Sequence, residues 1–386
     1  MLSTSSSVMV GMGLTNTDDF VILMGMIIGI EAERANNPVK TGVEHYAQQL
    51  ILQFAAIDTE NQYILYLRTQ PEEWIKNLPK NFSYRVMPFP IFWTQLRVSW
   101  EMLWHRPDVL FVPASSMPII HPRKTVVTVH DLAFMFYPET YTPFMRYFHM
   151  FEDVLVSQLA WKIITVSEST KRDFTKFWKT DEKRMRVVHH GFTPQSTTSY
   201  KLQVTSSLQL PEKFVLFLST VQPRKNLSGL IAAFRKFKQD HPDDAHKLVV
   251  AGKIGWRAEE TLQEIERNKD VVVYLNHVTD AERAELYAKT SALAVPSFYE
   301  GFGMWILEAF DAGVPVITSN ISSMPEVAGD AAEYCDPNNT DTIVVALEKV
   351  LLNKERAAAL VAKGSERLKI FSWRKCAAET LDVLKA

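Results

Sequence analysis

Short apolar segments alternate with helical stretches along most of this chain, and this alternation restricts the fold more than any other feature. The first segment is MIIGIEAE at Met26, and the amphipathic GVEHYAQQLILQFA follows it at Gly42. Short strands that are apolar throughout are typical of parallel sheets, because the connecting helices cover both faces. The other expected strands are YILYLR, YRVMPFP, VLFVPA, TVVTVHDL, KIITVSE, MRVVHHGF, KFVLFLS, KLVVAGK, VVVYLNHV, ALAVPS and VPVITS. We therefore predict an α/β fold with doubly wound parallel sheets.

A polar segment interrupts the alternation at residues 193–211. It is rich in Ser, Thr and Gln and carries Pro194 and Pro211 near its ends, a composition typical of a linker. Because 386 residues exceed what one hydrophobic core ordinarily supports, we expect two domains. The predicted units are a domain at 26–195, a linker at 196–211 and a domain at 212–368.

The longest apolar run, Phe20 to Ile30, is too short to cross a bilayer, which needs about 20 residues. No positive charge precedes this run and TNTDD interrupts its approach, so it differs from a signal peptide. We interpret its second half as the first buried strand. Residues 1–25 are expected to form a poorly ordered extension.

Composition restricts the class of protein further. The 47% hydrophobic and 22% charged residues are typical of a folded globular chain. With a net charge of −2, no basic field is available for a nucleic-acid backbone, so we expect no nucleic-acid partner. Cys335 and Cys376 have neither a metal-type spacing nor a disulfide pattern, which indicates a reducing cytoplasm.

Ligands of parallel α/β sheets bind outside the carboxyl ends of the strands, where loops lead into helices. Three such loops are VTVHDL, LSTVQPRKN and SFYEGFG. In the last, Gly301 and Gly303 allow a tight turn and a close backbone approach to a ligand. The helix that follows presents free N–H groups and the positive end of its dipole, which favour an anion.

Two glutamates flank this turn. Glu300 precedes the helix, and Glu308 lies about two helical turns further along the chain. Carboxylates accept hydrogen bonds from vicinal hydroxyls, so both acids suit sugar rings. Alternatively, Glu300 only complements the helix dipole and Glu308 is an exposed acid. The two acids alone do not decide between these interpretations.

Arg224 and Lys225 follow the strand KFVLFLS and precede a helix that opens near Asn226 or Ser228. Two cations beside a second helix N-terminus make a place for a diphosphate. The alternative is a solvated surface pair, and the position at the end of a strand counts against it.

His130 and Asp131 end a strand in the other half of the chain. We expect them to face a cleft between the two halves, as the loops of the second half do. They could contact a substrate, or they could be a structural histidine and an aspartate that caps the next turn. Gly42, in KTGVEHY, would let a backbone N–H meet a phosphate.

The segment SFYEGFGMWILEAFDAGVPVITSNISSMPEVAGDAAEYCDP resembles the donor-binding core of the group 1 (family 4-like) glycosyltransferases, which are retaining enzymes of GT-B fold with an E-x7-E motif. The resemblance extends over most of the chain from Met26 and is most specific in the second half. It implies two Rossmann-like domains that face a cleft, the first for the acceptor and the second for a nucleotide sugar. Its other matching segments are STVQPRKNLSGLIAAF, AGKIGW, YLNHVTDAERAELYAKTSALAVPS, VTVHDLAFMFYPETYTP and VSESTKRDF.

The resemblance implies a role for each matching residue. Glu308 would bind the ribose hydroxyls of the donor and Glu300 the transferred sugar. Lys225 and Arg224 would neutralise the diphosphate leaving group, and His130 would contact the donor sugar. Glu300, Lys225, Arg224 and His130 are thus the predicted catalytic residues. The other predicted donor-binding residues are Gly42, Asp131, Thr220, Asn276, Val278, Gly301, Phe302 and Gly303, with the loop from Asn276 to Val278 facing the base.

Several positions depart from the family pattern. Ser219-Thr220 stands where Gly-Arg is frequent, so one phosphate-binding arginine is missing, and Arg224 could replace it. Glu44 and His45 replace Gly and Arg in the loop after the first strand, and Trp305 replaces a frequent proline. The tail 369–386 resembles the helix that crosses back to the first domain.

Within this family, the chain resembles the branch of mannosyltransferases and related enzymes that have a PRKN loop. We therefore expect retaining transfer of a hexose, mannose first, from GDP-mannose or a UDP-sugar to an acceptor hydroxyl in glycan, polysaccharide or glycolipid synthesis. No acidic metal cage is evident in the sequence, so we expect neither a metal nor a separate cofactor. The alternatives are a nucleotide-sugar-binding pseudoenzyme in an assembly and a phosphorylase of the same architecture.

FPIFWTQLRVSWEMLWHR, residues 89–106, places aromatic residues beside basic ones. This segment could dock a lipid-linked acceptor at a membrane surface, which would add a peripheral contact at the inner membrane face to a cytoplasmic protein. The alternative is a buried amphipathic helix.

Overall fold

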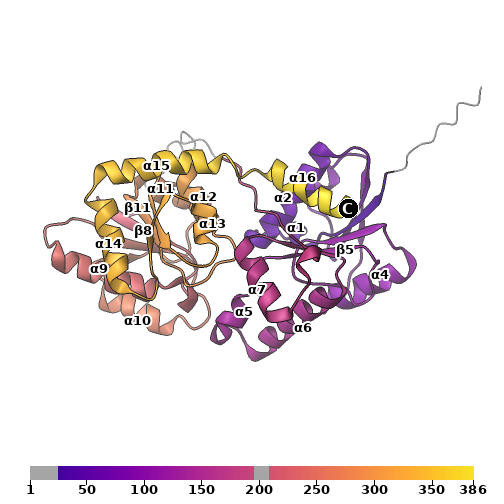
Figure 1. The fold of residues 1–386 in the computed structure, drawn as a ribbon, viewed down its shortest axis with the longest axis horizontal. Coiled ribbons are helices and arrows are strands. Elements are labelled where there is room, and N and C mark those ends of the chain that lie inside the picture. Colours follow the sequence, from indigo (N-terminus) through magenta and orange to yellow (C-terminus); the bar gives the residue numbers. More distant parts are fainter. Residues whose placement is uncertain (1–24, 195–207) are drawn as a thin grey trace, which may run out of the picture.

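The computed structural model describes residues 25–194 and 208–386, which form two parallel β-sheets, each covered by helices (Figure 1). Within these ranges the strand order is β3-β2-β1-β4-β5-β6-β7 in the first sheet and β10-β9-β8-β11-β12-β13 in the second. Every strand pairing is parallel, which confirms the predicted fold class.

The first sheet consists of β1 (Ile27–Glu31), β2 (Gln62–Leu67), β3 (Phe82–Val86), β4 (Val109–Val112), β5 (Thr125–Val129), β6 (Lys162–Thr165) and β7 (Met185–Val187). Its helices are α1 (Glu33–Asn36), α2 (Gly42–Ile57), α3 (Glu73–Lys76), α4 (Ser99–Trp104), α5 (Ala133–Phe136), α6 (Pro143–Leu159) and α7 (Glu168–Trp178).

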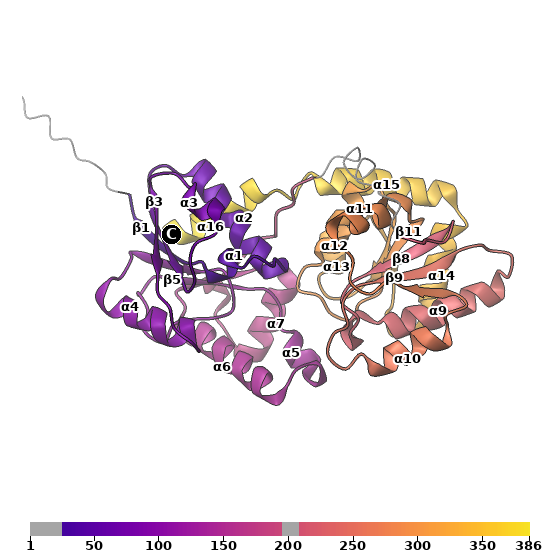
Figure 2. The same cartoon turned by 180° about the vertical axis from the view of Figure 1, so that it is seen from behind.

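The second sheet consists of β8 (Phe214–Leu218), β9 (Lys247–Ala251), β10 (Val272–Tyr274), β11 (Ala292–Val295), β12 (Val316–Ser319) and β13 (Ala332–Cys335). Its helices are α9 (Leu227–Asp240), α10 (Glu259–Arg267), α11 (Asp280–Lys289), α12 (Met304–Asp311), α13 (Met324–Ala328), α14 (Thr340–Leu351) and α15 (Lys354–Leu368), seen from behind in Figure 2. The last helix, α16 (Trp373–Lys385), follows α15.

The first sheet has a separate hydrophobic core on each face, as the alternating side chains of β4 show. Val109 and Phe111 pack into the core under α2 and α16, whereas Leu110 and Val112 pack into the core under α4 and α6. Successive strand residues point to opposite faces, so a strand that is apolar throughout serves both cores. The α4 and α6 helices therefore cover the face opposite α2 and α16.

One strand of the second sheet was not expected from the sequence. We predicted that VPVITS completes this sheet, and this was wrong: β13 pairs with β12, with Ala332 beside Val316. The strand contains Glu333, whose charge obscures the apolar pattern. That carboxylate is buried and accepts hydrogen bonds from Lys349 and Arg356.

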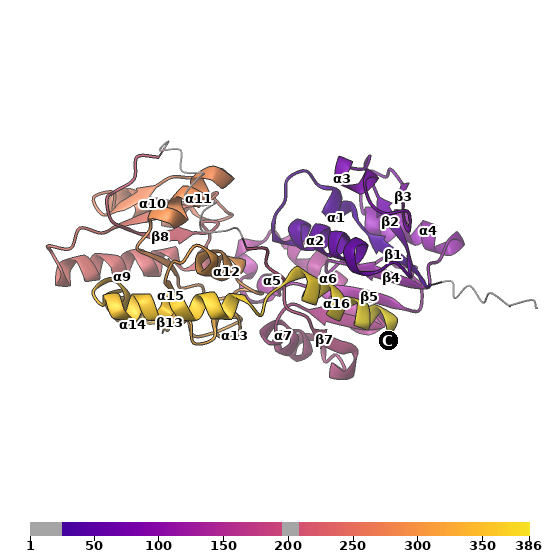
Figure 3. The ribbon, with the colours of Figure 1, turned by 90° about the horizontal axis from the view of Figure 1, so that it is seen from above.

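The C-terminal helix returns to the first domain. Whereas α15 contacts α12 in the second domain, α16 packs against α2 (Figure 3). Most of the predicted linker, and all but the last residue of the predicted extension at 1–25, lie outside the described residues, and the domain boundaries stay predictions. Several buried side chains of α16 join the core that the first sheet forms with α2. They include Trp373, Cys376, Ala377, Leu381 and Leu384.

Because α16 packs against the first domain, removing apolar surface from α16 should destabilise that domain. Leu384→Ala, at a fully buried position, should lower the free energy of unfolding of that domain by about 2–5 kcal/mol. Hydrogen exchange should therefore accelerate in α2 more than in α9. Lys385→Ala, at an exposed neighbour, is the control, and equal acceleration in both helices would contradict the assignment.

Candidate active site

The loop between β11 and α12 lies against the first domain. The carbonyl of Gly301 accepts a hydrogen bond from Ser167 Oγ (2.8 Å). A Cβ atom on Gly301 would lie 2.1 Å from the carbonyl oxygen of His130, far inside van der Waals contact. Only a glycine fits this approach, so the loop that carries the E-x7-E motif is also one of the contacts between the two domains.

Glu300 is the centre of a buried ion-pair network. Its Oε2 accepts from Arg224 Nη1 (3.0 Å), and its Oε1 accepts from Ser297 Oγ (2.9 Å) and from Lys225 Nζ. Arg224 also donates to the carbonyl of Tyr299 (2.9 Å). The structure thus brings together three of the four predicted catalytic residues at the ends of β8 and β11.

The ionisation of this network follows from its geometry. Burial alone would raise the pKa of Glu300, but Lys225 and Arg224 outweigh burial and lower it to about 2. Burial lowers the pKa of Lys225 to about 8, although Glu300 opposes this shift. Both members of the pair are therefore charged at neutral pH. The predicted anion-binding cations are held in place by Glu300.

Hydroxyl groups fix the backbone of the same loop. Ser322 Oγ accepts from Glu300 N (3.1 Å) and donates to the Glu300 carbonyl (2.8 Å), which also accepts from Ser323 Oγ (2.9 Å). Ser297, Ser322 and Ser323 were not predicted from the sequence. They follow β11 and β12 at neighbouring strand ends, and that position is the one signal that could have revealed them.

Glu308 faces a different partner set from Glu300. It lies on α12, which begins after Gly303 in the left-handed conformation (φ 95°), and contacts α11. Arg283 Nη1 donates to its Oε1 (3.2 Å) and Tyr287 Oη to its Oε2 (3.0 Å). Burial raises the pKa of Glu308, and Arg283 opposes that rise. The two acids of the motif thus serve two separate parts of the site.

His130 lies beside Gly301 on the first domain. Its Nε2 is 2.9 Å from the carbonyl of Pro113, and its ring packs edge-on against Tyr46 (4.9 Å between centroids) and His190 (5.4 Å). Burial lowers the pKa of His130. Because a carbonyl can only accept, the neutral ring is protonated at Nε2, and Nδ1 is left as a hydrogen-bond acceptor.

Asp131 makes the turn contact that was the alternative to a substrate role. Its Oδ1 accepts from the backbone N–H of Ala133 (2.9 Å) at the start of α5. Burial lowers the pKa of the Arg224 guanidinium, but Glu300 and, after it, Asp131 outweigh burial and raise that pKa. The structure thus places Asp131 at the boundary between the domains.

The remaining predicted donor-binding residues lie on separate loops at the strand ends. Gly42 begins α2, and a Cβ atom there would meet nothing within 4 Å. Thr220 is exposed after β8. Asn276 has a left-handed conformation (φ 57°), and its carbonyl accepts from Gly252 N (2.7 Å). Val278 is partly buried and packs against the hydrophobic core of the second domain, and Phe302 is buried in that core.

Three departures from the family pattern have structural explanations. Glu44 and Thr41 form a capping box at the start of α2, which satisfies N–H groups of the first turn. His45 packs edge-on against Trp373 of α16, 5.5 Å between ring centroids. Trp305 is buried in the hydrophobic core of the second domain. The structure gives no explanation for Ser219-Thr220.

Glu326, on α13 of the second domain, was not predicted as a functional residue. It accepts from the backbone N–H groups of Glu168 (2.8 Å) and Ser169 (3.3 Å) at the start of α7, and lies 2.6 Å from His189 Nε2. A carboxylate here complements the positive end of the α7 dipole across the domain boundary. No local sequence pattern marks such a contact.

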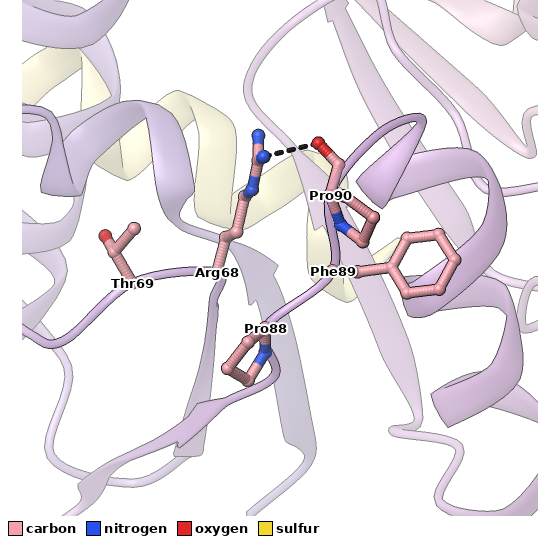
Figure 4. A pocket seen from close by; sticks show the side chains of 5 residues that line it. All are labelled: Arg68, Thr69, Pro88, Phe89 and Pro90. Atoms are coloured by element: carbon pink, nitrogen blue, oxygen red, sulfur yellow. Dashed lines mark hydrogen bonds between the residues drawn. The ribbon is translucent and has the colours of Figure 1, made fainter.

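Pockets on the described part of the molecule include one at a sheet edge and one between the domains. One, about 410 Å³, lies at the carboxyl ends of β2 and β3, the same edge of the first sheet as His130, and Figure 4 shows its lining with Arg68 donating to the Pro90 carbonyl. The other, about 520 Å³, lies between the domains and includes Ser322 and Glu326. The first is lined by Arg68, Thr69, Pro88, Phe89 and Pro90.

Among residues 25–194 and 208–386, no cluster of three or more His, Cys, Asp or Glu side chains could hold a metal ion. No helix in these ranges is long and apolar enough to span a bilayer.

Comparison with known proteins identifies the class. Residues 202–367 match the family model "Glycosyl transferases group 1", and residues 41–196 match "Glycosyltransferase Family 4". The O-antigen chain mannosyltransferase B of Escherichia coli is 32% identical over 270 residues, 68% of this chain and 70% of that protein. The serotype-specific mannosyltransferase WbdA of Escherichia coli is 27% identical over 284 residues, which span 69% of this chain and 33% of that longer protein.

Solved structures share the fold. The glycosyltransferase WaaG, described as involved in lipopolysaccharide biosynthesis, superposes with a TM-score of 0.69 at 17% identity, covering 94% of this chain and all of that one. Anabaena Alr3699/HepE, solved with UDP and glucose, gives 0.69 at 17% identity, covering 93% and 99%. Together the fold and the family matches define a glycosyltransferase of GT-B type. The chain belongs to the group 1, family 4-like glycosyltransferases, and its relatives include mannosyltransferases.

The close approach at Gly301 predicts a matched pair of outcomes. Gly301→Ala should push the loop away from His130, lower the free energy of unfolding by about 1–3 kcal/mol and increase the radius of gyration in X-ray scattering. Gly42→Ala, where a Cβ meets nothing within 4 Å, should change neither quantity. Equal behaviour of the two variants would contradict this role of Gly301.

The lowered pKa of Glu300 predicts a pH dependence of stability. A folded-state pKa of about 2, below the reference value of 4.5, means that its ionisation stabilises the fold above pH 4.5 and that this contribution is lost as the pH falls toward 2. In Glu300→Gln, Lys225 loses its buried partner, so stability at pH 7 should fall by about 3–5 kcal/mol.

Urea unfolding measured from pH 7 to pH 2.5 checks this. Wild type should lose more stability between pH 4.5 and 2.5 than Glu300→Gln does, so the two profiles should converge. Glu266→Gln, at an exposed acid paired with Lys269, is the control and should run parallel to wild type. Parallel profiles for Glu300→Gln would show that Glu300 is not the group responsible.

Proposed function

We propose that this glycosyltransferase transfers a hexose, mannose first, with retention from a nucleotide-diphosphate sugar to an acceptor hydroxyl in glycan, polysaccharide or glycolipid synthesis. The observation that carries the proposal is the convergence of Arg224 and Lys225 on Glu300 at the domain boundary, with Glu308 on the helix behind it. The printed names of the relatives, O-antigen chain and serotype-specific mannosyltransferases, support mannose as the sugar.

The second domain would bind the nucleotide through Glu308. Arg283 and Tyr287 orient its carboxylate, which accepts hydrogen bonds from the two vicinal hydroxyls of a ribose. The loop from Asn276 to Val278, at the end of β10, would face the base. A phosphate would require a hydrogen-bond donor at this position, whereas ribose hydroxyls require an acceptor, which the Glu308 carboxylate provides.

Arg224 and Lys225 would stabilise the leaving group. As the bond from the sugar C1 to the diphosphate oxygen breaks, negative charge grows on that oxygen, beside the two cations and the N-termini of α9 and α12. Both cations are already fixed by Glu300, so they need no reorganisation during the reaction. The diphosphate would share them with Glu300, whose carboxylate then lies beside the transferred sugar.

His130 would contact the donor sugar from the first domain. Its Nε2 is held by the Pro113 carbonyl, so Nδ1 is the atom that can accept from a sugar hydroxyl. The new bond forms between C1 and the acceptor oxygen, and the acceptor proton passes to the departing phosphate oxygen. Glu300 is tied to two cations, which makes it a poor nucleophile and favours attack by the acceptor from the face of the leaving group.

The pocket in Figure 4 is the proposed entry of the acceptor. It lies at the edge of the first sheet that carries His130, and Glu33 fixes its wall by accepting from the backbone N–H groups of Arg68 (2.7 Å) and Thr69 (3.2 Å). The predicted contact of residues 89–106 with a membrane is not needed for this reaction.

The test begins with a thermal-shift panel of nucleotide sugars, followed by donor hydrolysis and anomer analysis by NMR. Wild type should hydrolyse its preferred donor slowly with retention, and Lys225→Met should reduce turnover by about 10²–10³-fold. Lys247→Met, at an exposed lysine of the same domain, is the control. Unchanged turnover in Lys225→Met would refute the assignment.

The same assay separates the alternatives. A pseudoenzyme, suggested by Ser219-Thr220 in place of Gly-Arg, would bind a donor and hydrolyse none. A phosphorylase would require free phosphate instead of a nucleotide sugar.

A further inference from the structure

Helix α6 packs with its polar side inward. Three of its four buried side chains are polar (Glu152, Asp153 and Ser157, beside Val156), whereas Phe144 (67% exposed), Tyr147 and Phe151 face outward. An amphipathic helix of a globular protein ordinarily has the reverse orientation, with its apolar stripe against the core. The exposed apolar stripe of α6 is therefore not a by-product of core packing.

Polar contacts fix this orientation. Glu152 accepts from Gln95 Nε2 (2.8 Å) and lies 3.5 Å from His149 Nδ1. The carbonyl of Ser157 accepts from Arg184 Nη1 (2.9 Å). Turning the apolar stripe inward would break these bonds and leave buried polar groups without partners.

A second exposed apolar stripe lies on α4 and the π-helical turn at Thr94–Val98 before it. Leu96, Trp100 (61% exposed), Leu103 and Trp104 (71% exposed) follow helical spacing. The two stripes meet where Phe92 contacts Phe148 (5.6 Å between ring centroids). Figure 1 shows α6 on the lower margin of the first domain and α4 at the end of that domain farthest from the second domain. We call these two stripes the aromatic face.

The exposed charged side chains on the aromatic face itself are basic. Within residues 89–106 and 141–160, all of which the structure describes, the three acids Glu101, Glu152 and Asp153 are buried. Arg106 is exposed and Arg146 is partly exposed, whereas Arg97 and His105 lie 3.2 and 3.1 Å from the Glu101 carboxylate. Within these two ranges the face thus presents aromatic and basic side chains without an exposed carboxylate, and the exposed acids Asp108 and Glu139 lie just beyond them.

We propose that the aromatic face binds the surface of a lipid bilayer that contains anionic headgroups. Trp, Tyr and Phe gather where protein meets the bilayer interface, and basic side chains beside them are attracted to anionic lipids. A second copy of the chain is a poorer partner, because two such faces would bring basic groups together without acids between them. No described helix can span the bilayer, so the contact is with the surface.

The aromatic face and the active site are linked along the chain. The segment from β5 through His130 and α5 leads directly into the first turn of α6, which carries Phe144. The first turn of α6 is thus 14 residues along the chain from His130. Membrane binding itself does not depend on the proposed sugar transfer, so either proposal can fail without the other.

Vesicle co-sedimentation tests the proposal. Wild type should bind vesicles of phosphatidylcholine with 30% phosphatidylglycerol, and binding should fall in 0.5 M NaCl. The double variant Trp100→Ser/Phe144→Ser should partition about tenfold or more weakly. Trp256→Ser removes an equally exposed tryptophan (57%) from the second domain and should bind like wild type. Donor hydrolysis should be unchanged in all three proteins.

Hydrogen exchange on the wild type gives a second measurement that needs no variant. Anionic vesicles should slow exchange in residues 92–104 and 143–159, and not in α9. The proposal is overturned if wild type does not bind the vesicles, or if the double variant binds equally well. It is also overturned if wild type is a dimer in solution and the double variant is a monomer, because the aromatic face then binds a second copy of the chain.

Discussion

The close packing of Gly301 against the His130 carbonyl is the contact on which the rest of the site depends. It joins a loop of the second domain to a strand end of the first, with Ser167 bound to the same peptide. Glu300 directly precedes that glycine, so the contact between the domains lies next to the ion-pair network. The network itself lies within the second domain, where Arg224, Lys225 and Ser297 hold the Glu300 carboxylate.

The network around Glu300 holds two cations in a buried position in advance of any anion. Burying Lys225 alone would be costly, and its pKa of about 8 shows how far burial acts on it even with Glu300 beside it. The carboxylate thus stabilises a positive site that a diphosphate can then occupy. At the boundary between the domains, Glu326 of the second domain complements the N-terminus of α7 in the first domain, so an acid of the second domain meets positive groups there as well.

Local periodicity explains what could be predicted from the sequence. Strands apolar on both faces indicated the two parallel sheets, and the loops at their ends located Glu300, Arg224, Lys225 and His130 in one region. Contacts between distant loops left no such trace, which is why Ser322 was missed. A 3.6-residue period also shows that a helix has an apolar side but not which way that side faces, so the sequence did not reveal the inverted packing of α6.

The order of the chain and the order of assembly differ in one respect. The core of the first domain includes Trp373 and Leu384 of α16, so its last part is made after the whole second domain. During synthesis from the ribosome, the first domain must wait until α16 has been made to complete its core, whereas domains generally fold as they emerge. The half of the molecule that is translated first is therefore the one that reaches its native state last.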